Sequence, residues 1–152
     1  MTILPTNKRI AWTLAALWAC VIATLSTRYF SADHTAEALA YTGLSGEVLS
    51  EVNHVIRKSA HFTEYAILGF WCSLAIYRQS PKAYLTKGVI LATLICGLYA
   101  ISDEGHQVFV PNRTPAVKDV LIDSIGAAFA IYVLYRTSLF YRLDNLAKKH
   151  ES

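Results

Sequence analysis

Four apolar segments divide this chain of 152 residues, and they limit its fold more than any other feature. The first, residues 10–26, carries no charge, and about 17 residues form the shortest helix that crosses a bilayer. The other three lie at about residues 60–77, 88–102 and 120–140. The sequence therefore predicts an all-α membrane protein, a single domain over residues 1–152 that forms a bundle of four transmembrane helices.

The composition agrees with a membrane protein. Charged residues make up only 16% of the chain, whereas soluble domains typically carry about 25%. The net charge is +3 and the basic residues are not clustered with aromatic ones, so no nucleic-acid partner is expected. Cys20, Cys72 and Cys96 all lie within apolar segments and lack ligand-like spacing to histidine. We therefore expect no disulfide, no metal site and no cofactor.

The distribution of lysine and arginine predicts the orientation. With the N-terminus in the cytoplasm, nine basic residues lie on the cytoplasmic side and five outside, as the positive-inside rule requires. Only Asp144 and Glu151, of the 11 acidic residues, then lie inside. We expect a multi-pass protein of the cytoplasmic membrane with both termini in the cytoplasm, and the acidic outer side indicates a functional surface.

The longest connection, residues 27–57, contains apolar residues at spacings of three and four. They are Leu44, Val48, Val52, Val55 and Ile56. This pattern predicts an outer amphipathic helix that leads into the second span. Such a helix could lie on the membrane surface or pack over the mouth of the bundle, and the sequence does not distinguish these two placements.

Polar residues gather at the outer ends of spans two, three and four, in residues 57–65 and 103–123. Each could be a solvated residue at the interface or an ordinary packing residue. An unpaired ionised group facing the membrane interior is costly, however, so pairing across helices is favoured. We therefore predict one shared ligand-binding site. Its residues are Lys58, His61, Glu64, Tyr65, Glu104, Gln107, Arg113, Asp119 and Asp123.

Three blocks in these segments resemble the motifs of VanZ-like proteins. Residues 58–65 (KSAHFTEY) resemble the K-x-x-H-F-x-x-Y motif of that family. Residues 103–113 (DEGHQVFVPNR) are similar to its D-E-x-x-Q…P-G-R block, and residues 119–127 (DVLIDSIGA) to its D-V-x-x-N…G-A block. All three appear in order, which makes the resemblance more specific than any one block.

The chain departs from this family pattern at three positions. Asn112 replaces the usual glycine, Ala116 a common serine, and Asp123 the usual asparagine. The last change adds a carboxyl group to the site. The resemblance implies a protein of the bacterial cell envelope, and the namesake of the family is associated with resistance to the glycopeptide antibiotic teicoplanin.

Two functions remain open at this stage, and no catalytic residue is assigned. The first is binding of an anionic amphiphile at the outer leaflet, either a lipid-linked wall precursor or a lipoglycopeptide. Lys58 and Arg113 would then hold the anionic group. The alternative is a membrane hydrolase or transferase for a lipid-linked phosphate substrate, with His61 oriented by Glu64 or Glu104. A metal-dependent variant would use the acidic residues, but no HExxH or phosphatase signature is present.

Overall fold

The computed structural model describes residues 7–26, 43, 46–109, 116–142 and 145. Within these ranges every regular element is helical, which confirms the all-α class. The elements are α1 (Lys8–Leu25), α3 (Gly46–Gln79), α4 (Pro81–Ala83), η2 (Tyr84–Gly88), α5 (Val89–Gln107) and α6 (Val117–Thr137).

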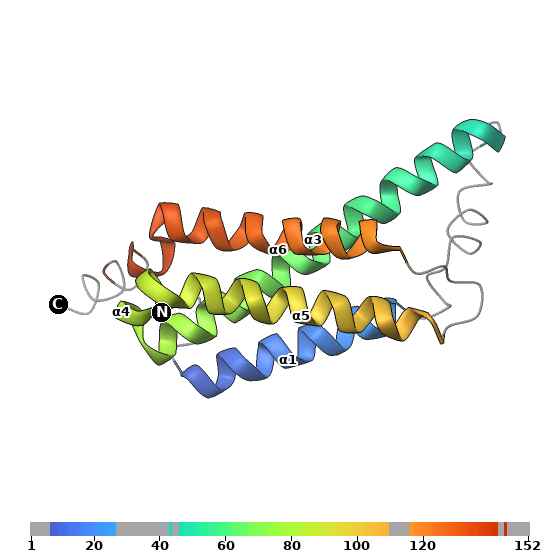
Figure 1. Cartoon of the computed structure of the whole chain (residues 1–152). Coiled ribbons are helices and arrows are strands. Elements are labelled where there is room, and N and C mark those ends of the chain that lie inside the picture. Colours follow the sequence, from blue (N-terminus) through green and yellow to red (C-terminus); the bar gives the residue numbers. More distant parts are fainter. Residues whose placement is uncertain (1–6, 27–42, 44–45, 110–115, 143–144, 146–152) are drawn as a thin grey trace.

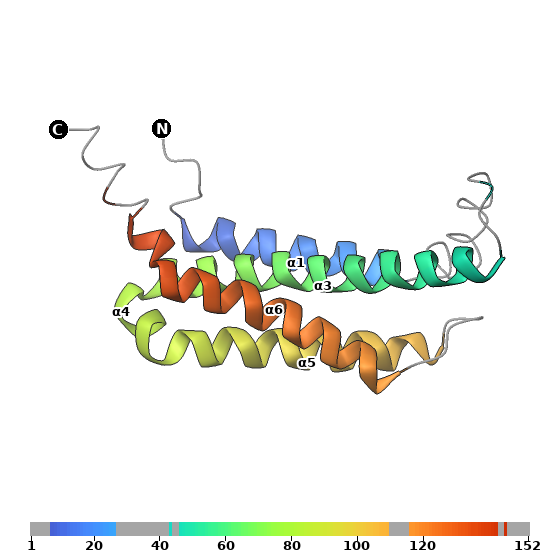
Figure 2. The same cartoon turned by 90° about the horizontal axis from the view of Figure 1, so that it is seen from above.

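The four long helices lie alongside one another in a single bundle (Figures 1 and 2). Helix α3 is central, because it packs against α1, α5 and α6, and α6 also packs against α5. One end of the bundle holds α4 and the start of α1, and is named the α4 end (Figure 1). At the opposite end α1 and α5 finish and α6 begins, and this end is named the polar end.

Helix α3 differs from expectation, because it joins the predicted amphipathic helix and the predicted second span in one element of 34 residues. At 1.5 Å per residue its length is about 51 Å, compared with about 30 Å for the hydrocarbon core of a bilayer. Its N-terminal part extends beyond the other helices (Figure 1), and Val55 there is 60% exposed. No glycine or proline lies between Gly46 and Gly69, so nothing in the sequence interrupts the helix.

Helix α1 has the length and hydropathy of a helix that crosses a membrane, with 18 residues and a mean hydropathy of 1.4. Among the described helices it alone meets both conditions, and a signal sequence near an N-terminus would meet them too. Helices α3, α5 and α6 instead combine apolar stretches with the polar residues of the predicted site.

Two glycines allow α3 and α6 to pack with their backbones in contact. A Cβ atom on Gly126 would lie 2.3 Å from the carbonyl oxygen of Phe62, and one on Gly69 would lie 2.8 Å from that of Ala127. Side chains at either position would therefore separate the helices. Because Phe62 follows His61 directly and Gly126 lies one turn after Asp123, this contact fixes the register of the predicted site.

Candidate functional site

A cluster of buried polar side chains occupies the polar end of the bundle. It draws on the end of α1, the middle of α3, the end of α5 and the start of α6. Every member is at most 8% exposed. The members are Ser26, His61, Asp103, Glu104, Gln107, Asp119 and Asp123.

Two ion pairs join α3 to α6 within this cluster. The Lys58 ammonium contacts Asp119 Oδ1, and His61 Nδ1 lies 3.2 Å from Asp123 Oδ1. Because the partners are three residues apart on α3 and four on α6, the two pairs are successive along the same helix–helix interface. The Lys58 side chain remains 28% exposed, so part of it reaches the surface of the bundle.

Asp123 is the most enclosed charged group of the cluster, with an exposed fraction of 0%. Its distance to His61 suits an ion pair, but the two groups are not aligned as a hydrogen bond. Among the described residues, neither oxygen of Asp123 has a hydrogen-bond partner, and the same holds for the Tyr65 hydroxyl and Glu104 Oε2. Buried polar atoms are usually paired, so these atoms mark where the polar groups of a ligand could be bound.

The carboxylates of α5 tie the other helices to the cluster. Asp103 Oδ2 accepts a hydrogen bond of 2.8 Å from the Ser26 hydroxyl, which follows α1. Glu104 Oε1 accepts one from the backbone N–H of Ala116, just before α6. Burial raises the pKa of the Glu104 carboxyl above its usual range, and the bond from Ala116 opposes that rise.

An apolar cavity of about 180 Å³ lies between α1, α3 and α5, next to the polar cluster. Small residues of α1, such as Ala15 and Ala19, form one wall, and Leu68 of α3 lies opposite. Tyr99 lines the cavity, and its ring centroid is 6.1 Å from that of Tyr65, which lies one turn after His61 on α3. The polar cluster and the apolar cavity are therefore neighbours along the bundle.

The structure brings together most of the site residues predicted from the sequence. Lys58, His61, Tyr65, Glu104, Gln107, Asp119 and Asp123 all lie in or beside the cluster. Glu64 is half-buried, and its backbone carbonyl accepts a 2.8 Å hydrogen bond from Trp18 Nε1. Arg113 lies outside the described residues, and the ligand-binding role of the whole set stays a prediction.

The structure adds a contact of His61 that the sequence did not predict. The enzyme alternative had Glu64 or Glu104 orienting the imidazole, and the structure places Asp123 of α6 against its Nδ1 atom. The prediction also omitted Asp103 and Ser26. Asp103 belongs to the D-E block and shares a helix face with Gln107, so the motif could have identified it. Ser26 carries no sequence signal, because its role depends on how α1 docks.

No three histidine, cysteine or carboxylate side chains within the described ranges are arranged to hold a metal ion. The cluster instead combines cations with carboxylates, so the ammonium of Lys58 is already neutralised by Asp119. This arrangement suits hydrogen bonding to an oxygen-rich ligand together with one charged contact.

Comparisons with known proteins identify the family of the chain. Neither the curated proteins nor the solved structures contain a significant match to it. A family model described as VanZ/LLP1 matches residues 9–141, a range that includes the four long helices except the first residue of α1, together with the complete polar cluster. The chain belongs to the VanZ/LLP1 family.

Proposed function

We propose that the protein is a multi-pass protein of the bacterial cytoplasmic membrane that binds an anionic amphiphile at its polar end. The ligand would be a lipid-linked wall precursor or a lipoglycopeptide such as teicoplanin, and in the latter case the protein would contribute to glycopeptide resistance. Membership of the VanZ/LLP1 family and the arrangement of the buried polar cluster beside an apolar cavity support this proposal.

The outer surface of the bundle supports insertion of all four helices. Large apolar side chains are exposed along the middle of the helices, among them Leu17 of α1, Leu98 of α5 and Phe129 of α6. Leu98 is 67% exposed. Such a surface is unfavourable in water over so large an area, whereas it suits contact with lipid chains.

The distribution of charge supports an outward-facing polar end. The described basic residues at the α4 end have no described acidic residue near them in the sequence. These residues are Lys8, Arg9, Arg78, Lys82, Lys87, Arg136 and Arg142. By the positive-inside rule, the α4 end would lie in the cytoplasm. The polar cluster would therefore face the outer leaflet, where wall precursors and antibiotics are met.

The observation that carries the binding proposal is that a partly exposed cation, Lys58, lies near buried oxygen atoms that have no described hydrogen-bond partner. Lys58 would contact the anionic group of the ligand while Asp119 holds it in place. Asp123, Tyr65 and Glu104 would bond the hydroxyl or amide groups of a sugar or peptide. The hydrocarbon tail would occupy the apolar cavity beyond Tyr99.

A specific contact also favours the alternative, an enzyme acting on a lipid-linked phosphate. His61 Nδ1 faces the buried Asp123 carboxylate, which would orient the ring and leave Nε2 to move a proton. In an enzyme His61→Ala would lower turnover by about 10²–10⁴-fold with little change in affinity. In a binding protein without turnover, the same variant would change affinity only moderately.

The test is binding of a polyprenyl phosphate by the full-length protein in nanodiscs, with the uncharged polyprenol as the comparison ligand. Lys58→Gln should weaken polyprenyl-phosphate binding about ten-fold, because a charge-assisted contact is lost. Lys118→Gln is the matched control, since Lys118 is exposed at the start of α6. Equal binding of phosphate and alcohol, or equal effects of the two variants, would contradict the proposal.

A further inference from the structure

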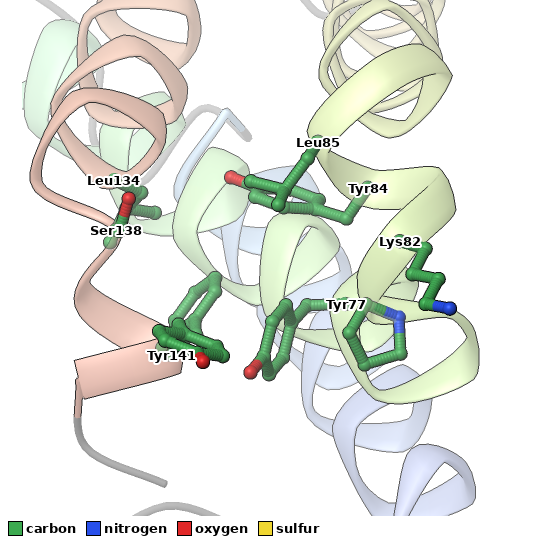
Figure 3. A pocket seen from close by; sticks show the side chains of 9 residues that line it. Tyr77, Lys82, Tyr84, Leu85, Leu134, Ser138 and Tyr141 are labelled. Carbon is green, nitrogen blue, oxygen red and sulfur yellow. The ribbon is translucent and has the colours of Figure 1, made fainter. Parts of the chain in front are cut away.

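A second cavity lies at the α4 end, remote from the polar cluster. Its volume is about 200 Å³, and it opens between η2 and the end of α6. Figure 3 shows Tyr77, Tyr84 and Tyr141 around this opening, with Leu134 and Ser138 on the α6 side. The proposed function does not use this pocket.

The floor of the pocket is a preformed aromatic cluster. The ring centroids of Tyr77 and Phe140 are 5.3 Å apart, those of Tyr77 and Tyr84 are 5.9 Å apart, and those of Tyr84 and Phe140 are 6.0 Å apart. All three residues are buried, whereas Leu85 and Tyr141 at the rim are exposed. The cavity therefore has a rigid apolar floor and an open edge.

Two irregular stretches of backbone shape this pocket. Ser138 has a φ of 48°, in the left-handed region, and this turn ends α6 and directs Phe140 into the floor. On the opposite side, η2 is a segment of π-helix that carries Tyr84 and Leu85. Segments of π-helix inside helices often occur at functional sites. Both irregular stretches therefore position aromatic residues of the pocket, Phe140 after Ser138 and Tyr84 within η2.

The charge around the pocket is positive. Lys82 lines the rim, and the guanidinium carbon of Arg78 lies 5.5 Å from the centroid of the Tyr77 ring. The other described basic residues near this end belong to α1, η2, α6 and the residues that follow α6. An apolar cavity with a basic rim complements a ligand that has a hydrocarbon chain and an anionic group.

We propose that this pocket binds one acyl chain of an anionic phospholipid from the surrounding leaflet, with the phosphate beside Lys82. An apolar cavity of about 150 Å³ is large enough to hold benzene, so this one can take the first few methylene groups of an acyl chain, next to the glycerol and the phosphate. Basic residues near a membrane surface attract anionic lipids. The inference requires that the bundle lies in a membrane, but it is independent of the ligand at the polar end.

The experiment uses the full-length protein in phosphatidylcholine vesicles that contain a small fraction of phosphatidylglycerol with a photoreactive diazirine on one acyl chain. After illumination, mass spectrometry of peptides locates the label. We expect it to concentrate on the segments that contain Tyr84 and Tyr141 rather than on the exposed apolar face around Leu98. Flotation of the vesicles first shows that the protein is inserted, and failure there would overturn the membrane proposal as well.

Two pairs of variants make the result specific. Lys82→Gln and Tyr141→Ala should each reduce labelling of the pocket about five-fold, since one removes the cation and the other removes a wall. Lys87→Gln and Tyr132→Ala are the controls, because they alter an exposed lysine near the same end and an exposed tyrosine outside the pocket.

Four results would overturn the proposal. The label could spread evenly over the exposed apolar faces, as for ordinary surrounding lipid. Lys82→Gln could label as strongly as Lys87→Gln. A phosphatidylcholine probe with the same diazirine could label the pocket equally well. Finally, glycerol phosphate could abolish labelling, which would assign the site to a soluble phosphate compound.

Discussion

At the polar end, α3 and α6 are joined by two ion pairs, whereas at the α4 end α3 meets the turn after α6 through aromatic rings. His61 and Asp123 depend on each other, because losing either leaves a buried polar group unpaired. Tyr77 and Phe140 make contacts with no fixed donor and acceptor, so a change of shape costs less. We therefore expect a substitution in the ion pairs of the polar end to lower stability strongly, and a substitution in the aromatic contacts of the α4 end to lower it less.

The glycine contacts between these two ends explain how the packing of α3 against α6 positions both the ion pairs and the aromatic contacts. Gly126 and Gly69 hold α3 against α6 between the ion pairs and the aromatic cluster. Backbones in contact leave no freedom for the helices to slide, so the register that pairs His61 with Asp123 is also the register that places Tyr77 near Phe140. A change at either glycine should therefore reach both ends.

The largest effect is expected for Asp123→Ala. Removing one partner of a buried pair typically costs about 3–5 kcal/mol, and His61 would be left without its carboxylate. The free energy of unfolding, measured in detergent with a chemical denaturant, should fall by about that amount. Asp123→Asn should cost clearly less, because it retains polar atoms and is the residue that the family block usually carries. An Asp123→Ala protein as stable as the unmodified protein would mean that the pair does not stabilise this end.

Gly126→Ala comes next, with an expected loss of about 1–3 kcal/mol in the same measurement. The new methyl group would lie 2.3 Å from the Phe62 carbonyl oxygen, and a backbone atom cannot move aside without shifting the helix. Gly97→Ala on α5 is the matched control, since its Cβ meets nothing within 4 Å and alanine favours helix by about 1 kcal/mol. A Gly126→Ala protein as stable as the control would refute the close contact of α3 with α6.

A smaller loss, about 1 kcal/mol, is expected for Phe140→Leu at the α4 end. Leucine keeps most of the buried volume but loses the ring contacts to Tyr77 and Tyr84. Tyr135→Leu is the control on the nearby, more exposed surface of α6. A loss for Phe140→Leu that equals the loss for Asp123→Ala would remove the contrast between the two ends.

The helices and the meeting of the three sequence blocks at one end were predictable from the sequence. Apolar segments and helical spacing report which residues lie on one face of their own helix, as for Lys58, His61 and Tyr65. They do not report the register between helices. The pairing of His61 with Asp123 depends on the Gly126 contact with Phe62, and this contact has no local pattern.

The two irregular stretches at the α4 end show a second limit of the sequence. Ser138 adopts a left-handed conformation that glycine or asparagine usually occupies, so its residue type does not indicate the end of α6. The π-helical turn at Tyr84–Gly88 has no residue signature either. The aromatic pocket was therefore not predictable, although Tyr77, Tyr84 and Phe140 are plain in the sequence.

The smallest predicted effect concerns Ser138 and has the opposite sign. Its φ of 48° is unfavourable for a residue with a Cβ, while its N–H still bonds the carbonyls of Leu134 and Tyr135. Ser138→Gly keeps those bonds and removes the steric cost, so stability should rise by about 0.5–1 kcal/mol. Ser138→Ala, which keeps the Cβ, should be close to neutral in the same denaturant measurement. If glycine instead lowers stability, the greater conformational freedom that it gives the unfolded chain outweighs the strain that it removes from the folded one. The backbone strain at Ser138 would then be small, and the packing of Phe140 would be what holds the turn.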